Sequence, residues 1–123
     1  MSTPVPLLRR GDVFWIDLDP ARGSEAPKSR PAVVVSNDGA NTAAHRHGRG
    51  VVTVVPVTSN TARVYPFQVL IKAAEHQGLR TDSKAQAEQV RTVDVSRIGR
   101  RITALNPETM KRLDAALRLH LAL

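Results

Sequence analysis

One arginine stands where a polar segment meets a strand that the sequence predicts to be buried. Arg30 follows the turn-forming stretch GSEAPKS and precedes Pro31 and the apolar run AVVV. A proline restricts the residue before it to extended conformations, so the position of this guanidinium is restrained. A guanidinium is permanently charged, and its planar fork can bind two phosphate oxygens at once. The residue types at this junction therefore indicate phosphate binding.

The alternative role for Arg30 is a structural ion pair. Asp17, Asp19 and Glu25 lie nearby in the sequence, and each could form a salt bridge with the guanidinium at the rim of the strand. Surface ion pairs of this kind are common and contribute little to stability. The residues alone leave both roles open.

A second candidate is the sequence His-Arg-His at positions 45–47. Two histidines can exchange protons near neutral pH and so serve as the general acid and base of a ribonuclease. The same pair could belong to a metal site, but no acidic residue lies at ligand spacing. Most loop histidines have neither role. His76, expected at a strand end, and His120, expected on the polar side of the last helix, are not expected to take part in chemistry.

Two other features permit contact with nucleic acid without requiring it. Trp15, the only tryptophan, could stack on a base with a gain of about 1–3 kcal/mol, or it could be a core or interface residue. The basic groups at 99–101 (GRR) and 110–112 (MKR) could contact phosphates or could simply be solvated.

The charge of the chain favours a nucleic-acid partner. Lysine and arginine number 18 against 11 acidic residues, a formal net charge of +7, and most of the basic residues are arginine. A small basic protein of this kind is typical of nucleic-acid binding, although an arginine-rich overall composition is the other explanation. The absence of cysteine excludes a disulfide scaffold, a thiol nucleophile and a cysteine-ligated zinc.

The length and the apolar segments predict one domain without a membrane segment. The 123 residues suit a single compact domain spanning 1–123. The first residues, MSTPVPLLRR, lack the apolar core of a signal peptide, and no later run is long enough to cross a bilayer. We therefore expect a cytoplasmic protein.

Turn-forming residues divide the chain into short strands. Strands are expected at 12–18, 30–37, 51–59, 65–71 and 100–105. The third is nearly all β-branched and is expected to be buried on both faces. The intervening segments are expected to be a loop at 19–29, a loop with at most one helical turn at 38–50, a turn at 78–83, a strand or helix at 84–93 and a short helical turn at 94–99. Five or six strands predict a small antiparallel barrel.

The end of the chain carries the clearest helix pattern. Asn106 is a suitable N-cap and Pro107 fits the first helical position. Leu105 and Met110 have the spacing of a hydrophobic staple. Further leucines continue the apolar stripe from Met110, namely Leu113, Leu117 and Leu121. The fold class is therefore mainly β with a C-terminal helix.

Several motifs in order resemble those of the MazF/PemK family of toxin endoribonucleases. They are RRGDVFWIDLDPARGSE at 9–25, SRPAVVVSND at 29–38, VVTVVPVTS at 51–59, GLRTDS at 78–83 and QVRTVDVSRI at 89–98. The resemblance covers nearly the whole chain, from about Arg9 to the last turn of the terminal helix. It implies an SH3-like barrel of the MazF, CcdB and Kid type, a homodimer, and an acidic antitoxin of the MazE type. It also implies sequence-specific cleavage of single-stranded RNA without metal or cofactor, which inhibits translation and growth.

The resemblance also implies roles for individual residues. Gly11 and Asp12 match the motif that opens the first strand, and the loop from 18 to 29 matches a loop that gates the RNA groove. Arg30 and Thr58 match the catalytic arginine and threonine. The RNA-binding positions implied in this way are Asp17, Arg22, Ser24, Glu25, Lys28, Ser59, Gln89, Arg91 and Thr92. Val95, where a basic residue is common, and Ala26, where a glutamine is common, depart from the pattern and bear on RNA specificity.

The implied chemistry agrees with these residue types. RNA supplies its own nucleophile, the 2′-hydroxyl, and the products would be a 2′,3′-cyclic phosphate and a 5′-hydroxyl. Arg30 can stabilise the charge on the phosphate oxygens, and Thr58 can exchange a hydrogen bond with the same phosphate. An arginine is almost never deprotonated in a protein, so the identity of the general base stays open.

Two functions of other classes remain open from the sequence. The first is a toxin of the same fold that poisons gyrase, a topoisomerase, by binding a protein. It predicts binding through the terminal helix and no dependence on Arg30 or Thr58. The second is a non-catalytic SH3-like module, which predicts affinity for RNA without cleavage.

Overall fold

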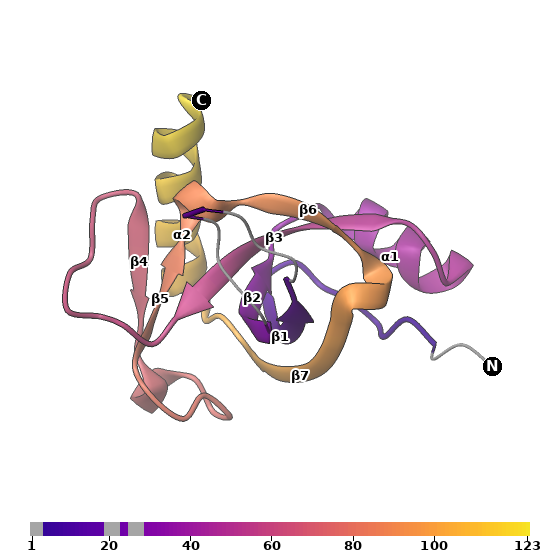
Figure 1. Cartoon of the computed structure of the whole chain (residues 1–123), viewed down its shortest axis with the longest axis horizontal. Helices are drawn as coiled ribbons and strands as arrows, with labels where there is room; N and C mark the ends of the chain where they lie inside the picture. The colour runs from indigo at the N-terminus through magenta and orange to yellow at the C-terminus, as the bar shows by residue number, and fades with distance from the viewer. Residues whose placement is uncertain (1–3, 19–22, 25–28) are drawn as a thin grey trace.

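The computed structural model describes residues 4–18, 23–24 and 29–123 (Figure 1). The strands are β1 (Asp12–Asp17), β2 (Ser29–Val34), β3 (Val51–Thr58), β4 (Gln68–Ile71), β5 (Ser83–Gln86), β6 (Arg91–Asp94) and β7 (Ile98–Ala104). The helices are α1 (Asp38–His47) and α2 (Pro107–Leu121), and three short 3-10 turns are η1 (Ala73–Glu75), η2 (Ala87–Gln89) and η3 (Val95–Arg97).

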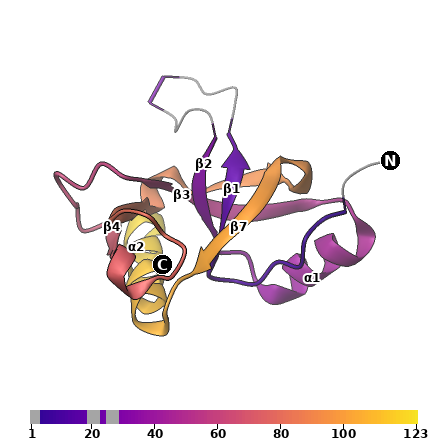
Figure 2. The ribbon, with the colours of Figure 1, turned by 90° about the horizontal axis from the view of Figure 1, so that it is seen from below.

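The strands form one antiparallel sheet. Their order is β4-β5-β3-β2-β1-β7, and β6 pairs with the first half of β3. The helices α1 and α2 lie on opposite sides of the strands β1, β2 and β7 (Figure 2). The prediction of a mainly β, antiparallel fold with a C-terminal helix is confirmed, but in the part of the chain described the sheet is not closed into a barrel.

Two apolar clusters lie on the two faces of the central strands. Successive side chains of a strand point to opposite faces, so one strand can contribute to both clusters. On β1, Phe14 and Ile16 belong to one cluster with Ala44 of α1, whereas Val13 belongs to the other. On β3, Val52 and Val54 join the first cluster and Val55 and Val57 the second. The prediction that this strand is buried on both faces is confirmed for its central residues.

The segment 38–50 differs from the prediction. It was expected to be a loop with at most one helical turn, and ten of its residues form α1. The side chain of Asn37 caps the helix by accepting a hydrogen bond from the backbone N–H of Ala40 at 2.9 Å. Gly48 ends it in the left-handed conformation, with φ of 65°. The cap and the glycine were present in the sequence, but the polar character of the segment concealed them.

The ambiguous segment 84–93 contains a strand, a 3-10 turn and a second strand, namely most of β5, then η2 and the start of β6. The short helical turn expected at 94–99 is confirmed as η3. The strand expected from Tyr65 begins three residues later, at Gln68, because the N–H of Gln68 closes a turn onto the carbonyl of Tyr65 at 2.8 Å. The described residues therefore form seven strands, where five or six were expected.

The terminal helix begins as predicted. The side chain of Asn106 accepts a hydrogen bond from the N–H of Thr109 at 2.8 Å, and Pro107 is the first helical residue. Leu105, Met110 and Leu113 belong to the same apolar cluster. Leu121 lies outside it, because the last turn extends beyond the sheet and leaves that side chain 49% exposed. Within the described residues, no helix has the length and apolar character needed to span a membrane.

Candidate active site

Arg30 and Thr58 come from adjacent strands that run in opposite directions. β2 pairs with β3 so that Ala32 faces Pro56. Arg30 lies two residues before Ala32 and Thr58 two residues after Pro56, so both residues lie at the same end of this strand pair, although 28 positions separate them in the sequence.

A groove of about 880 Å³ opens at this end of the strands. Arg30 and Thr58 both line it, and Ser59 follows Thr58 along its wall. The other lining residues are Trp15, Ser29, Pro31, Val57, Gly78, Leu79, Arg80, Thr81, Ser83, Arg100, Arg101 and Ile102. Arginines therefore contribute positive charge from β2, from the turn before β5 and from β7. A groove with this charge suits a phosphate-bearing ligand.

Trp15 lines the same groove from the other face of the strands. It pairs with Pro31, whereas Arg30 pairs with the next residue of β1, Ile16. Neighbouring residues on a strand point to opposite faces, so the indole and the Arg30 side chain start on opposite sides of the sheet. Trp15 is 36% exposed, so it is not a core residue.

A hydrogen bond joins the predicted RNA-binding residues Ser24 and Gln89. The side-chain amide of Gln89, in η2, donates to the carbonyl of Ser24 at 3.1 Å. Ser24 belongs to the segment between β1 and β2, which the resemblance identifies as the gate of the groove. The contact brings η2 and Ser24 together, although 65 positions separate the two residues.

Arg91 and Thr92 lie farther along the sheet. They pair with Val54 and Thr53 of β3. Val54 precedes Thr58 by four residues in this strand, so Arg91 lies about 13 Å from Thr58 along β3 at the usual rise of a strand. Neither residue lines the groove. Asp17, the last residue of β1, is exposed and accepts a hydrogen bond at its backbone carbonyl from Arg97 at 3.2 Å.

Three predicted RNA-binding residues, Arg22, Glu25 and Lys28, lie outside the described residues. So do Ala26 and Asp19, the latter one of the carboxylates considered as a partner for Arg30. The described site therefore consists of Arg30, Thr58 and the groove around them.

Comparison with known proteins decides the family. The chain matches, over residues 9–121, the family described as PemK-like, MazF-like toxin of type II toxin-antitoxin system. This chain belongs to that family. It is 58% identical over 117 residues to endoribonuclease MazF9 of Mycobacterium tuberculosis, covering 95% of this chain and 98% of the relative. These matches confirm the prediction that the protein is a toxin endoribonuclease.

Solved structures agree with the fold. The crystal structure of MazF from Deinococcus radiodurans matches 96% of this toxin and 99% of its own chain, with a TM-score of 0.78 and 26% identity. An endoribonuclease in complex with its cognate antitoxin, from a mycobacterial species, matches 94% of this toxin and 96% of its own chain, with a TM-score of 0.70 and 26% identity.

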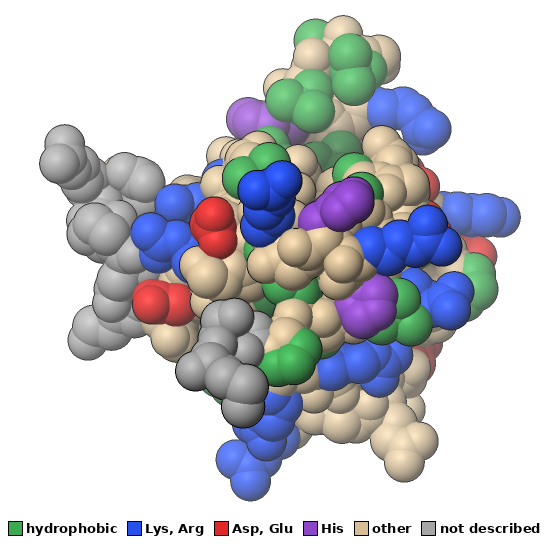
Figure 3. All heavy atoms as spheres, turned by 90° about the vertical axis from the view of Figure 1, so that its right-hand side faces the viewer, with side chains coloured by type: hydrophobic (Ala, Val, Ile, Leu, Met, Phe, Trp, Pro, Cys, Tyr) green, Lys and Arg blue, Asp and Glu red, His purple; other side chains and the backbone are tan. Residues whose placement is uncertain are grey.

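The histidine candidates of the toxin lie away from the groove. His45 and His47 are in the last turn of α1, and Nδ1 of His45 donates to the carbonyl of Val5 at 2.8 Å. Figure 3 shows the face that carries α1, where histidine side chains lie among lysines and arginines. Within the described residues, no three histidine or acidic side chains gather as metal ligands would.

His76 has a structural position rather than a chemical one. Its ring is buried, with Nδ1 donating to the carbonyl of Lys72 at 2.8 Å and Nε2 accepting from the N–H of Asn106 at 3.1 Å. The ring thus joins η1 to the start of α2. His120 is exposed on α2, as expected.

The Gly-Asp motif builds the turn that starts β1. Gly11 has a φ of 95°, which favours glycine. Asp12 is buried and accepts hydrogen bonds from the N–H of Arg9 at 3.1 Å and from Nη2 of Arg101 at 3.4 Å. Arg101 lines the groove, so this motif helps to hold one of its arginines.

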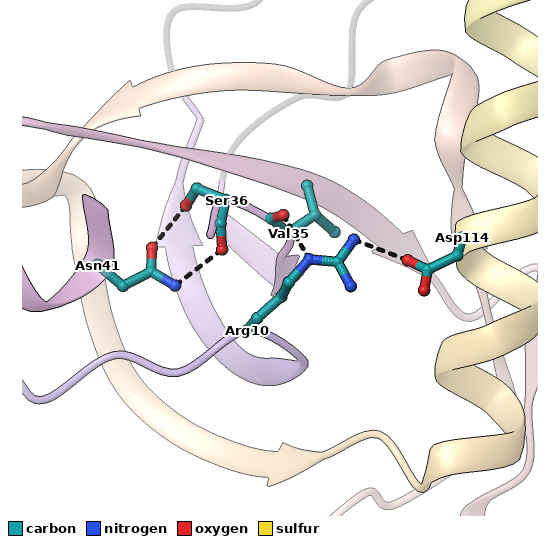
Figure 4. A network of polar contacts seen from close by, with 5 residues as sticks. All are labelled: Arg10, Val35, Ser36, Asn41 and Asp114. Carbon is teal, nitrogen blue, oxygen red and sulfur yellow. Dashed lines mark hydrogen bonds and ion pairs between the residues drawn. The ribbon is translucent and has the colours of Figure 1, made fainter. Parts of the chain in front are cut away.

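Arg10 connects this turn to both helices, and Figure 4 shows its contacts with Val35 and with Asp114 of α2. Its Nε donates to the carbonyl of Val35 at 2.8 Å and its Nη2 to Asp114 of α2 at 2.7 Å. Its backbone N–H donates to Asp38 of α1 at 2.7 Å. This hydrogen bond, a second from Asn41 and the charges of Arg9 and Arg10 hold the pKa of Asp38 below its ordinary value.

The pKa of Asp94 is lowered by a similar local arrangement. Its carboxylate accepts a hydrogen bond from the backbone N–H of Ser96 at 2.8 Å, and the hydroxyl of Ser96 and the charge of Arg97 act in the same direction. Asp94 thereby caps η3. Both aspartates belong to the scaffold rather than to the groove.

Sequence reasoning missed two basic residues near Thr58. Arg80 lies in the segment GLRTDS, which was interpreted as a turn and as one of the family motifs without a role for its arginine, and it lines the groove. Lys84 pairs with Thr58 across β3 and β5 and is buried, with 8% exposure. A lysine in the segment 84–93 gave no signal of burial, because only the strand pairing reveals its position.

Proposed function

We propose that this protein cleaves single-stranded RNA at specific sequences, with Arg30 and Thr58 acting on the phosphate at the cleaved bond. The observation that supports this most is that both residues, from the adjacent strands β2 and β3, line one groove that three further arginines also line. Membership of a toxin family whose relatives are named endoribonucleases supports the same reaction.

The RNA supplies the nucleophile. The 2′-oxygen attacks the adjacent phosphorus, the O2′–P bond forms and the P–O5′ bond breaks. The 2′-hydroxyl loses a proton and the 5′-oxygen gains one, so the step is balanced without an oxidant or a co-reactant. The products are a 2′,3′-cyclic phosphate and a 5′-hydroxyl.

Arg30 and Thr58 act on the charge that develops. A guanidinium can donate two parallel hydrogen bonds to the phosphate oxygens, which carry more charge in the transition state than in the substrate. The hydroxyl of Thr58 can donate a third hydrogen bond. Neither role requires a metal ion or a cofactor, and the reaction is proposed to be metal-independent.

We propose that the protein is a homodimer, as the family resemblance implies, and that an acidic antitoxin blocks the groove. The complexes solved for related toxins contain an antitoxin. A formal charge of +7 and a groove with several arginines suit a disordered acidic tail that places carboxylates where phosphates would lie. Antitoxin and uncleavable RNA should therefore compete, and the antitoxin should associate more slowly as salt rises.

The proposed substrate also indicates where the protein acts. Cellular RNA available for translation lies in the cytoplasm, and we place the toxin there. Cleavage of that RNA would inhibit translation and growth.

The test is incubation of a long single-stranded RNA with the toxin in excess chelator, followed by mapping of the new 5′ ends. We expect cleavage at a recurring sequence, with 5′-hydroxyl ends, and cleavage by Arg30→Ala that is slower on the order of 10²–10³-fold. RNA binding without cleavage would instead support the non-catalytic module. Growth inhibition that survives Arg30→Ala and Thr58→Val would support the gyrase-poisoning alternative. Activity lost in chelator and restored by zinc or manganese would overturn the metal-independent scheme.

A further inference from the structure

The segment that follows Thr58 carries an ordered group of aromatic and basic side chains. Residues 59–67 connect β3 to β4. The rings of Tyr65 and Phe67 are stacked, with centroids 5.3 Å apart and planes within 1° of parallel. The guanidinium carbon of Arg63 lies 5.6 Å from the Tyr65 ring centroid, and its Nη1 donates to the Tyr65 hydroxyl at 3.2 Å. Two of the four aromatic residues of the chain are therefore placed in this one connection.

Lys84 of β5 contacts this connection, and β5 pairs with the end of β3 that carries Thr58. Its Nζ donates to the carbonyl of Arg63 at 2.5 Å and lies 5.9 Å from the Tyr65 ring centroid. A buried ammonium is unfavourable unless its hydrogen bonds are satisfied, so these contacts determine where the chain around Arg63 can lie. Lys84 is also the direct partner of Thr58 in the sheet. Strands are about 4.8 Å apart, so the Lys84 side chain links the aromatic group to the strand next to Thr58.

Tyr65 remains partly exposed to solvent despite these contacts. It is 41% exposed, and its neighbour Val64 is 40% exposed. A fixed aromatic ring with basic neighbours, accessible from solvent, is the arrangement with which proteins bind single-stranded nucleic acid. Bases splayed from a single strand stack on aromatic rings or on arginine guanidinium planes.

We propose that Tyr65, supported by Phe67 and Arg63, stacks a nucleobase of the RNA close to the cleaved bond. The proposal rests on the function proposed above and names a binding subsite for its substrate. An RNA base fits better than an apolar protein segment, because two cations flank the ring and the phosphates of the strand would lie beside them. Stacking of this kind contributes affinity with little sequence preference of its own.

The experiment begins with an oligonucleotide that spans a mapped cleavage sequence and carries a 2′-deoxy nucleotide at the attacking position, so that it binds without being cleaved. Its affinity is measured for the wild-type toxin and for Tyr65→Leu, Tyr65→Phe and Val64→Ala. We expect Tyr65→Leu to bind on the order of 5- to 100-fold more weakly. Tyr65→Phe keeps the ring and should bind within a few-fold of wild type. Val64→Ala changes an equally exposed neighbour and should have no effect.

A set of the same oligonucleotide with single abasic positions locates the base. In the wild type, one abasic position near the cleaved bond should weaken binding as much as Tyr65→Leu does. In Tyr65→Leu, the same abasic position should cost nothing further, because ring and base would be the two halves of one contact. The proposal would be overturned if the abasic position and Tyr65→Leu weakened binding independently of each other. It would also be overturned if Tyr65→Leu bound with wild-type affinity at an unchanged melting temperature, and the ring would then be a surface for another partner.

Failure of this inference can be told apart from failure of the proposed function. If the toxin cleaves RNA and depends on Arg30, but Tyr65→Leu binds the oligonucleotide normally, only the stacking subsite is wrong. If no RNA is cleaved or bound, the proposed function is wrong and the subsite fails with it.

Discussion

The guanidinium of Arg10 donates to the carboxylate of Asp114 at 2.7 Å, across 104 positions of sequence. Arg10 precedes β1 and Asp114 lies in the middle of α2, so this ion pair ties the two ends of the domain together (Figure 4). Both side chains are about two-thirds buried, with exposures of 33% and 28%. The ion pair is less screened than one on the open surface.

We predict that Arg10→Ala lowers the free energy of unfolding by about 1–2 kcal/mol, because it removes the contacts to Asp114 and to the carbonyl of Val35. Unfolding in urea measures this value. The double-mutant cycle with Asp114→Ala should give a coupling of about 0.5–1 kcal/mol. Strictly additive effects would show that the ion pair contributes nothing.

We predict that Arg30→Ala reduces single-turnover cleavage on the order of 10²–10³-fold, the usual effect of removing one group that stabilises a developing charge. Arg30→Lys should also be strongly impaired, because lysine lacks the planar fork. Arg118→Ala, an exposed arginine of α2 outside the groove, is the matched control and should cleave normally. Unchanged melting temperatures would show that the loss is chemical. Full activity of either Arg30 variant contradicts the assignment.

Thr58→Val and Thr58→Ser separate the hydroxyl of Thr58 from its shape. Valine keeps the branched shape that suits the end of β3 but has no hydroxyl, so cleavage should fall on the order of 10- to 100-fold. Serine keeps the hydroxyl, and its rate should stay within a few-fold of wild type. Single-turnover rates on the mapped RNA measure both. Equal rates for valine and wild type would leave the reaction to Arg30 alone.

Asp38 makes the free energy of unfolding depend on pH in the acid range. Its pKa is lower in the folded state than the ordinary aspartate value of about 3.9, because it accepts hydrogen bonds from Arg10 and Asn41 near basic residues. Its stabilising contribution is therefore complete above that ordinary value and is lost as pH falls through the lower folded-state pKa. The stability advantage of wild type over Asp38→Asn should shrink as the pH falls below about 4. An advantage independent of pH would contradict this.

Much of the fold is determined locally by the sequence. The proline-bounded start of β2, the β-branched run of β3 and the cap and proline of α2 each specify their element through short-range sterics and hydrogen bonds. The family was predicted from motifs spread along the chain, from about Arg9 to the terminal helix, and the resemblance implied its chemistry. The helix α1 was missed although Asn37 and Gly48 marked its ends, because its outward side chains are polar and only Asn41 and Ala44 are buried.

Other features depend on which strands pair, and a linear sequence does not specify this. Lys84 lies beside Thr58 because β3 pairs with β5. Arg91 lies beside Val54, four residues before Thr58 in the same strand, because β6 pairs with the other half of β3. The groove with Arg80 and Arg101, the ion pair of Arg10 with Asp114 and the fixed ring of Tyr65 arise in the same way. The sequence by itself determined the candidate chemistry and most elements, because those depend on neighbouring residues. Only the tertiary structure decided which distant side chains meet, because that depends on strand order and register.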